Sequence, residues 1–540
     1  MASLENMVLE VPTAEAAAVV GRTCEEQDFQ AAFEREYRAH QQTKTELARM
    51  RDHAAYLEAK VQKLEGDIAY LKKLLFSKKT EQQPGSSQSA PLAEPNQAPK
   101  KHGAQPGHAA HPRKIPAHLP TQEQVHSLPP EKCVCALCGL PLEELHSEES
   151  SYEVTVQTCR YIVIRHRRKK YRKTCACPHP LVTAPGPLKL FPGGLYAMEF
   201  WIEVLVNKYA FALPLTRQAQ MMQLEGLDIS AGVLADGLLK LLLRLQPLYE
   251  LMQARIALEK LVHADETRWR NWAGRYQVEG EAVKAEQWLW GFFSVHFRLF
   301  VIAPTRGAKV VKDTLGQGAQ QTVVATLVCD RYSAYKSAGN TLAYCWVHVR
   351  RDYLALQIKY PGHTALVEWS QAWLNLIAAL YHVNALRVQH RNEPSQFRAY
   401  QEQLQGVLER MQDLMKGPAV HVAQAAQVES MKSHWVGLTR FMDDPDIPLD
   451  NNLAERELRT PVVGRKNFYG THSDPATAAT AIAYSILSTC KLHHVDPRKF
   501  LKRFLTAQLQ CGESPMTPEQ LEAFLPHRYA ELYPQDLIPP

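Results

Sequence analysis

The sequence has no long apolar run. None of its uncharged apolar stretches reaches the roughly 18 to 20 residues that a helix needs to cross a bilayer. The opening residues, MASLENMVLEVPTAEAAAVV, carry acids and no basic segment ahead of an apolar core, so they lack the pattern of a secretory signal. We therefore expect a soluble protein of the cytoplasm, without a membrane partner.

The sequence also has few cysteines and only a small excess of charge of one sign. The 11 cysteines in 540 residues cluster only in residues 133–138 and 175–177, which in a reducing compartment favours metal binding over disulfides. Lys and Arg number 62 and Asp and Glu 56, so the net charge of +6 permits a polyanionic partner without requiring one. With 45% hydrophobic and 22% charged residues, the chain is not wholly disordered.

A heptad pattern follows a variable segment, residues 1–44. Apolar residues recur at alternating steps of three and four between residues 47 and 75. β-branched residues at position a with leucine at position d favour a parallel, two-stranded coil, so we predict a self-associating coiled coil in residues 45–82. The alternative is one amphipathic helix that packs on its own protein. The seam contains Val61 and Ile68 at a, and Leu57, Leu64 and Leu71 at d.

A linker and a cysteine module come next. Residues 83–130 are rich in Pro, Gly, Gln and Ser, a composition that cannot bury a core. Residues 131–185 contain two close cysteine pairs, separated by an alternating segment that supplies hairpin strands, and so resemble a zinc ribbon. The four cysteines that we expect to hold one zinc ion are Cys135, Cys138, Cys175 and Cys177.

The second cysteine pair leaves the zinc site less well defined. Cys175 and Cys177 have one intervening residue, one fewer than the usual knuckle, and either His179 or Cys133 is a possible substitute ligand. The alternative is a small β module of unligated cysteines.

Two neighbouring segments suggest contacts with nucleic acid. A run of cations, Arg167, Arg168, Lys169 and Lys170, lies beside the cysteine module and is a candidate for phosphate contacts, although such runs are often only a solvated face. Residues 186–258 have a helical pattern. Within them a short helix, a turn and a second helix capped by Ser230 fit a helix-turn-helix, or else an ordinary helical hairpin.

Strand patterns begin at residue 259 and carry acids. We expect one strand that ends in Asp265, two strands joined by a turn near His296, a connecting helix, and a fourth strand that ends in Asp330. This order is typical of a ribonuclease H-like sheet, in which acids converge on metal ions. Either aspartate alone is explained as a helix N-cap, but two at neighbouring strand ends suggest a site. Glu266 is turned to the opposite face by strand alternation.

A third acid is needed on a helix that crosses the sheet. The best candidate is Glu455 in the segment DNNLAERELR, although a capping box with Asn452 or a pair with Arg459 explains this glutamate equally well. Residues 259–345 and 443–512 then form the two parts of the core, residues 346–442 form a helical insertion, and residues 513–540 form a tail. At the start of the insertion, we interpret Cys345 and His348 as structural or substrate-positioning residues.

Several strings together resemble the transposases of the insertion sequence 66 family. They are DETRWR from residue 265, CDRYSAYK from 329, CWVHVRRDY from 345, and IPLDNNLAERELR with GRKNFYG between 447 and 470. The helix that ends in LLFSKKTEQ, the linker segment HGAQPGHAAH and the helical segment YAFALPLTRQ are also similar to that family. The resemblance therefore covers most of the chain, and the short second cysteine pair is its main departure.

The resemblance implies a multidomain α+β protein: an N-terminal coiled coil, a zinc-ribbon-like module, a helical DNA-binding region, and a ribonuclease H-like catalytic α/β domain with a helical insertion. It also implies that Asp265, Asp330 and Glu455 are the DDE acids, with Asn451 and Asn452 beside the third. Carboxylates suit the two magnesium or manganese ions that this chemistry needs. Further candidate DNA contacts are Arg350, Arg351, Arg459, Arg465 and Lys466.

The function implied is metal-dependent cleavage and strand transfer at the ends of the protein's own insertion sequence. The partners implied are the terminal repeats, target DNA, a second copy of the chain and companion proteins of the element, in a bacterial cytoplasm and on the nucleoid. Two alternatives remain open: a catalytically silent DNA-binding regulator, and a DDE-type nuclease without strand transfer.

Overall fold

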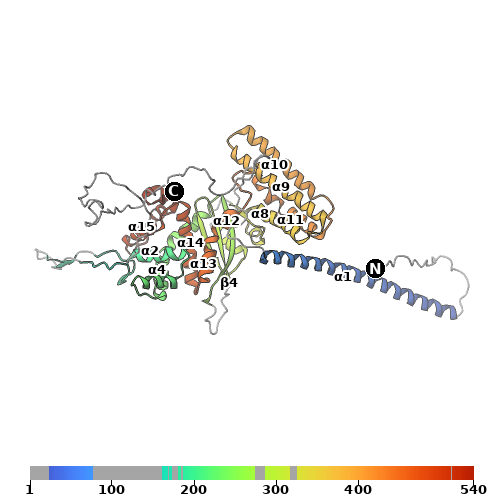
Figure 1. Ribbon diagram of the computed structural model, residues 1–540, viewed down its shortest axis with the longest axis horizontal. Helices are drawn as coiled ribbons and strands as arrows, with labels where there is room; N and C mark the ends of the chain where they lie inside the picture. Colours follow the sequence, from blue (N-terminus) through green and yellow to red (C-terminus); the bar gives the residue numbers. More distant parts are fainter. Residues whose placement is uncertain are drawn as a thin grey trace, which may run out of the picture. The chain divides into compact units, whose positions relative to one another are not determined.

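The computed structural model describes residues 24–76, 161–167, 170–172, 181–183, 186–273, 286–316, 325–512 and 514–539 (Figure 1). The chain divides into two compact units, of which the first contains Met1–Gly85, Arg351–Leu376 and Met411–Glu429, and the second contains the rest. The expected mixed α+β class is confirmed: most elements are helices, and one five-stranded mixed sheet lies among them. Within the described ranges, no helix is long and apolar enough to cross a membrane.

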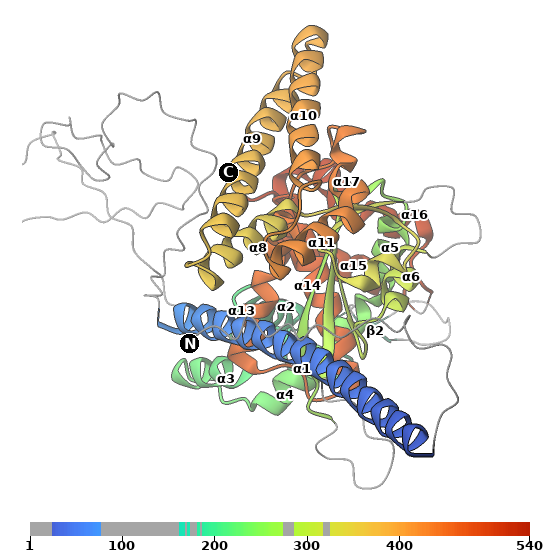
Figure 2. The same cartoon turned by 90° about the vertical axis from the view of Figure 1, so that its right-hand side faces the viewer.

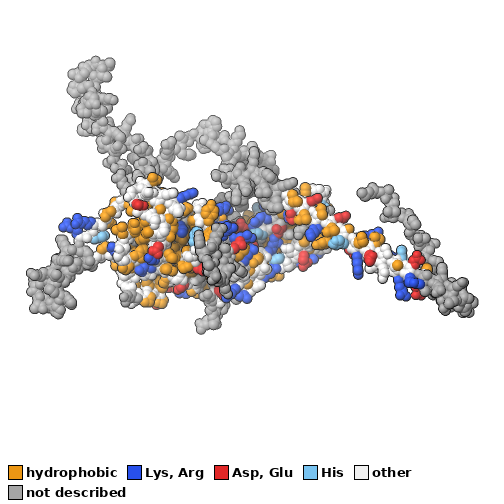
Figure 3. All heavy atoms as spheres, turned by 90° about the horizontal axis from the view of Figure 1, so that it is seen from below, with side chains coloured by type: hydrophobic (Ala, Val, Ile, Leu, Met, Phe, Trp, Pro, Cys, Tyr) orange, Lys and Arg blue, Asp and Glu red, His pale blue; other side chains and the backbone are white. Residues whose placement is uncertain are grey.

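The first unit contains the long helix α1 (Cys24–Phe76), which includes the predicted heptad seam. The large apolar residues of the seam, from Leu47 to Ile68, are 45–68% exposed. Figure 3 shows apolar side chains along α1 between charged ones. The same unit holds the end of α8 (Trp346–Lys359), where Lys359 pairs with Asp67 of α1. In the start of α9 (Thr364–Gln389), Trp373 stacks on Tyr353 at 5.0 Å between ring centroids.

The contact between α1 and α8 does not use the seam. A Cβ atom built on Gly66 would lie 3.1 Å from the Cβ of Lys359, so a glycine allows the two helices to approach closely. Gly66 and Asp67 occupy heptad positions f and g, outside positions a and d. The packing of α1 on its own protein therefore leaves the apolar seam facing outward.

The second unit is built around the five-stranded sheet. Its strands are β3 (Leu261–Arg270), β4 (Glu286–Phe293), β5 (Arg298–Ala303), β6 (Thr326–Cys329) and β7 (Thr341–Tyr344). The order across the sheet is β5-β4-β3-β6-β7, with β3, β4 and β5 antiparallel and β6 and β7 parallel to β3. The connecting helix α6 (Ala308–Leu315) lies between β5 and β6 in the chain, as expected.

Two details of the sheet differ from the sequence-based expectation. The first strand does not end at Asp265 but continues to Arg270, because its second half still pairs with β4 after the pairing with β6 has stopped at His263. The four-residue strand β7, before α8, was not predicted, because it is too short to show a periodic pattern. The turn near His296 is confirmed between β4 and β5.

The outer edge of the sheet is covered by α14 (Asp474–Leu492). Its Ser485 hydroxyl accepts a hydrogen bond from the backbone N–H of Phe300 at 2.8 Å, and its Thr489 hydroxyl accepts one from that of Arg298 at 3.0 Å. Both donors lie on the edge strand β5, whose polar groups would otherwise be left without partners in a buried setting. This helix also packs on α2 (Met198–Tyr209), on α5 (Gln246–Ile256) and on α15 (Pro497–Gln510), and in Figure 1 α2 and α15 lie beside it.

The predicted helix, turn and second helix are present as α3 (Leu215–Leu224) and α4 (Ala231–Arg244). Ser230 caps α4, because its hydroxyl accepts from the N–H of Val233 at 3.3 Å. On the exposed side of α4, Lys240 is paired with Asp236 at 2.7 Å. The outline of a helix-turn-helix is therefore present, and the exposed Lys240 of its second helix is already paired with an acid.

The predicted helical insertion contains α8, α9, α10 (Pro394–Leu414) and α11 (Val422–Leu438). Figure 2 shows α9 and α10 side by side. In the part of this pair that belongs to the second unit, the buried Arg387 donates to Gln401 Oε1 at 2.6 Å and to the carbonyl of Phe441 at 2.7 Å. The remaining helices are η3 (Arg440–Met442), α12 (Asn452–Glu457), α13 (Arg459–Phe468), α7 (Ser333–Lys336), α16 (Pro518–Ala523), α17 (Pro526–Leu532) and η4 (Pro534–Asp536).

Little of the cysteine module is described. The strands β1 (Lys170–Arg172) and β2 (Leu181–Thr183) pair antiparallel, at the end of the segment for which hairpin strands are predicted. The predicted zinc ligands Cys135, Cys138, Cys175 and Cys177, and the substitutes Cys133 and His179, lie outside the described residues.

Candidate active site

The two aspartates lie level with each other on neighbouring parallel strands. The register pairs Leu261 with Thr326 and His263 with Val328, so Asp265 and Asp330 each lie two residues beyond the last of these pairs. Asp330 Oδ1 also accepts the backbone N–H of Tyr332 at 2.9 Å, which is the turn-forming role expected of an aspartate after a strand. That bond leaves the second carboxylate oxygen of Asp330 for other partners.

Helix α12 brings Glu455 to the same place. Its N-cap residue, Asn451, makes no side-chain cap bond; instead the buried amide crosses to β3. Asn451 Oδ1 lies 2.9 Å from His263 Nδ1, and its Nδ2 donates to the carbonyl of Ala264 at 2.8 Å. These two bonds fix the start of α12 against the residues that immediately precede Asp265.

A second anchor holds the other end of α12. Glu457 Oε1 lies 3.4 Å from Nε of the buried Arg298 on β5. The backbone N–H of Asn451 also donates to Cys345 Sγ at 3.3 Å, and the N–H of Trp346 donates to the carbonyl of Leu449 at 2.9 Å. The helix that carries Glu455 is thus fixed to the sheet on one side and to the start of α8 on the other.

The three acids interact electrostatically. Burial, together with the negative charges of Glu266, Asp330 and Glu455, raises the pKa of Asp265 to about 7. A divalent cation would relieve this repulsion, and three carboxylates are the oxygen ligands that magnesium prefers. However, among the described residues no group of three or more His, Cys, Asp and Glu side chains forms a cluster that could hold a metal ion. The donor set therefore fits in kind, although the side chains do not enclose an ion.

Glu266, next to Asp265, has a different role. Its buried carboxylate accepts from Nε of Arg306 at 2.8 Å and from the hydroxyl of Tyr335. Burial raises the pKa of this glutamate, while the bonds from Tyr335 and Arg306 oppose that shift. Arg306 in turn lies over the ring of Tyr332 at 3.8 Å. Glu266 therefore holds an arginine in place, and sequence reasoning did not identify that arginine.

His348 lies beside one of the three acids Asp265, Asp330 and Glu455, hereafter called the acid cluster: its Nε2 is 3.9 Å from Oε1 of Glu455. The buried thiol of Cys345 is used as an acceptor for the backbone of Asn451. This arrangement favours a structural role for Cys345 and a positioning role for His348 over a shared metal site.

The candidate DNA contacts are spread over several elements. Arg465, on α13, donates to Thr267 Oγ1 at 3.1 Å and to the carbonyl of Arg268, so it lies against β3 on the face that Asp265 shares. Exposed cations among the candidates are Arg167, Arg350, Arg351, Arg459 and Lys466. Arg168 and Lys169 lie outside the described residues, and Lys170 begins β1.

The raised pKa of Asp265 predicts how the metal-free protein responds to pH. The folded protein keeps this proton up to about pH 7, whereas an unfolded chain releases it near 3.8, the ordinary pKa of an aspartate. Folding therefore takes up a proton between these values, and stability falls as pH rises through that window. Asp265→Asn is expected to raise the melting temperature in EDTA by about 2 °C or more at pH 8 and to have little effect at pH 4.

Differential scanning fluorimetry at the two pH values measures this difference, and magnesium supplies the control. Magnesium should stabilise the unsubstituted protein at pH 8 and not the Asn variant. If Asp265→Asn and the unsubstituted protein have equal melting temperatures at pH 8 as well as at pH 4, that result would contradict the burial of a charged carboxylate at this position.

Comparisons with known proteins agree with the geometry. The family model described as "Transposase IS66 family" matches residues 193–479, more than half of the chain. Two similar proteins come from Sinorhizobium fredii (strain NBRC 101917 / NGR234). Uncharacterized protein y4jD is 26% identical over 435 residues, which cover 76% of this chain and 81% of the relative. Uncharacterized protein y4qI is 28% identical over 449 residues, which cover 79% of each chain.

One solved structure is a weak match. It is titled "Crystal structure of the Mos1 Strand Transfer Complex", is 11% identical, and covers 28% of this chain and 54% of its own. The TM-score of 0.10 is too low to indicate a shared overall fold.

Proposed function

Because the chain belongs to the IS66 transposase family, we propose that it binds the ends of its own insertion sequence and catalyses metal-dependent DNA strand cleavage and strand transfer. The observation that supports this most strongly is the convergence of three acids from separate parts of the chain. Asp265 and Asp330 are level on adjacent strands, and Asn451 fixes the helix of Glu455 beside them.

We also propose that the sheet is ribonuclease H-like. The chain first forms three antiparallel strands, and the next two strands lie on the other side of the first strand and parallel to it. This order places the acids of the first and fourth strands side by side. The helix α12 contacts β3 and β4, so it crosses the sheet where the third acid of such a site is required.

In the proposed site, Asp265, Asp330 and Glu455 would hold two magnesium or manganese ions. Bound there, the ions would supply Lewis-acid stabilisation of the attacking and leaving oxygens. Asn451 and Arg298 keep α12 in place, and Arg465, which is half-buried against β3, is directed to a DNA phosphate close to Asp265. Water attacks the phosphate and breaks its bond to the 3′ oxygen, which leaves as a free 3′ hydroxyl. That hydroxyl then attacks a target phosphate, forms a new P–O bond and displaces the 3′ oxygen of the target strand.

The test uses purified full-length protein and a DNA fragment that carries the sequences flanking its coding region. With magnesium, cleavage at fixed positions and products joined to a second DNA are expected. Cleavage without joining would identify a nuclease, and binding without cleavage would identify a catalytically silent regulator. EDTA is the control for both.

We further propose that the cysteine module binds one zinc ion and contributes to recognition of the DNA ends. The basic run from Arg167 to Lys170 adjoins it, and Arg167 is exposed. Metal analysis is expected to give one zinc per chain, and Cys138→Ser is expected to abolish end-specific binding while non-specific binding persists. Zinc-free protein, or a Cys138→Ser variant with full end binding, would refute the site.

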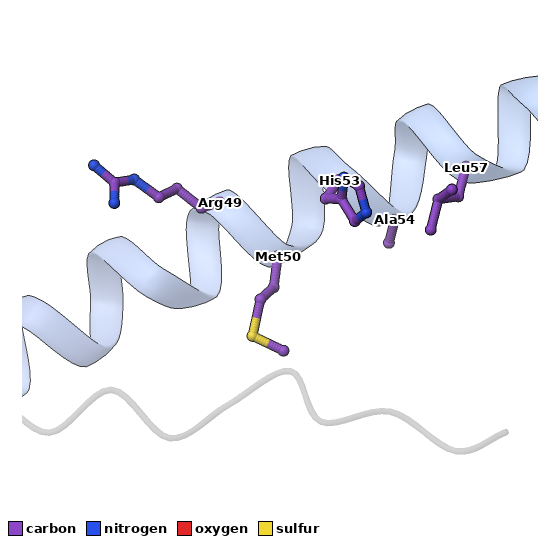
Figure 4. A pocket seen from close by; sticks show the side chains of 5 residues that line it. All are labelled: Arg49, Met50, His53, Ala54 and Leu57. Carbon is purple, nitrogen blue, oxygen red and sulfur yellow. The ribbon is translucent and has the colours of Figure 1, made fainter.

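We propose that the seam of α1 joins two copies of the chain, since a transposase must bring two ends together. Figure 4 shows Met50, Ala54 and Leu57 on one side of α1, where with Arg49 and His53 they line a hollow. A hollow between successive seam residues is what receives a side chain from a partner helix in knobs-into-holes packing.

A further inference from the structure

Tyr469, in the motif GRKNFYG, has an unusual backbone. It follows α13 with φ of 61° and ψ of 11°, in the left-handed region. That position after a helix normally belongs to glycine or asparagine, and a bulky aromatic residue there is strained. Its side chain is nevertheless 69% exposed, so burial of the ring does not offset the energy of this strain.

The backbone around Tyr469 is fixed from several sides. Its carbonyl accepts from Nε1 of Trp272 at 2.9 Å, and its own N–H donates to the carbonyl of Arg465 at 2.7 Å. Thr471 exchanges backbone bonds with Arg270 at 2.9 Å and with Trp272 at 2.7 Å. A Cβ on Gly470 would lie 2.1 Å from the carbonyl of Arg270, so the chain approaches β3 too closely for any other residue. The surroundings thus hold Tyr469 in the strained conformation and its ring in solvent.

Cations lie on the segments that adjoin Tyr469. The guanidinium of Arg270 lies 5.3 Å from the centre of the Trp272 ring, and both Arg270 and Lys466, in the last turn of α13, are exposed. Strands rise about 3.3 Å per residue, so Arg270 lies about 17 Å along β3 from Asp265. Arg465, which bonds to Thr267, lies between these two positions.

We propose that Tyr469, Trp272, Arg270 and Lys466, hereafter the Tyr469 platform, bind an unpaired stretch of the DNA strand that enters the acid cluster, with one base stacked on Tyr469. An exposed aromatic ring on a fixed backbone, with cations on the adjoining segments, offers what single-stranded nucleic acid requires: a face for a base and charges for the phosphates. A fully paired duplex offers its bases only at its end, so the platform selects frayed or unpaired ends.

This inference rests on the proposed function, because it takes DNA as the substrate. It is tested without catalysis, by fluorescence anisotropy in EDTA with full-length protein. The probes are a duplex from the element end with a short single-stranded tail, the same duplex with abasic residues in the tail, and the blunt duplex. The unsubstituted protein is expected to bind the first probe about tenfold or more tighter than the second, from one base stack.

The informative variant is Tyr469→Gly, because glycine accepts the left-handed conformation without strain and the variant should fold at least as well as the parent. It is expected to lose the preference for bases in the tail, while Tyr469→Phe keeps it. Tyr56→Ala, which removes a tyrosine that is 60% exposed on α1, is the control and should leave the preference unchanged. A 2-aminopurine in the tail should be quenched by the parent and by Tyr469→Phe, but not by Tyr469→Gly.

The outcomes separate the two hypotheses. If the parent binds DNA but does not distinguish abasic from natural tails, or if Tyr469→Gly keeps the distinction, the platform is wrong and the proposed function stands. If the parent binds none of the probes, both the platform and the proposed function are overturned. A lower melting temperature for Tyr469→Gly, with base preference intact, would assign Tyr469 a structural role instead.

Discussion

Replacing Asp265 by Asn is expected to lower metal-dependent strand cleavage by at least about 100-fold, because it removes one of the carboxylates that would hold the ions. DNA binding in EDTA should change by less than about threefold, since the substitution keeps the shape of the side chain and removes a negative charge. Cleavage of a labelled element end and anisotropy with the same DNA measure the two quantities separately.

Asp330→Asn and Glu455→Gln should behave in the same way, and Asp443→Asn is the matched control. Asp443 is an exposed acid of the same unit, paired with Arg440 within a helical turn, and its loss should leave cleavage unchanged. Near-normal cleavage by any one of the three acid variants would remove that residue from the proposed triad.

Charging the seam of α1 is expected to halve the mass of the protein in solution. In a Leu57→Asp, Leu64→Asp double variant, a parallel pair of helices would bury four carboxylates at neighbouring core positions, a cost of several kcal/mol that a coil of about four heptads cannot absorb. Light scattering at micromolar concentration measures the mass. Loss of the dimer should also abolish paired-end joining, whereas nicking of a single end should remain detectable.

The matched control places the same charges on the outer face of the helix. Ala48→Asp with Tyr56→Asp alters two exposed residues at heptad positions b and c and should leave the mass unchanged. These variants are cleaner than deletion of residues 1–80, which also removes the contact of Asp67 with Lys359. Equal masses for the seam variant and the parent would mean that the seam does not join two chains.

The elements that the sequence predicted well are those with local patterns. The helix of the heptads, the strand that bears Asp265 and the helices of the insertion each have a period that extends over many residues. The four-residue strand before Asp330 was predicted from its apolar run. The level placement of the two aspartates also follows from local order, because parallel strands end at the same edge of a sheet.

What could not be predicted depends on contacts between distant residues. The bond between Asn451 and His263 spans 188 positions in the chain, and no local pattern indicates that an N-cap asparagine will bond to a strand instead of its own helix. Arg306 and Tyr469 were missed for related reasons. One is identified only by its buried partner Glu266, and the other occupies a position where the usual signal is glycine.

The long separation between β3 and Asn451 has a consequence for the order of synthesis. At about 5 to 20 residues per second, a ribosome needs roughly 10 to 40 s to pass from His263 to Asn451, 188 residues later. Once Asp330 has been made, the nascent chain has two of the acids but neither Glu455 nor the helix that carries it. Ribosome-bound chains stalled before α12 should therefore fail to nick DNA in magnesium, while chains stalled well beyond it should succeed. The part that completes the proposed cutting site is translated late, which would spare the cell DNA breaks by unfinished copies.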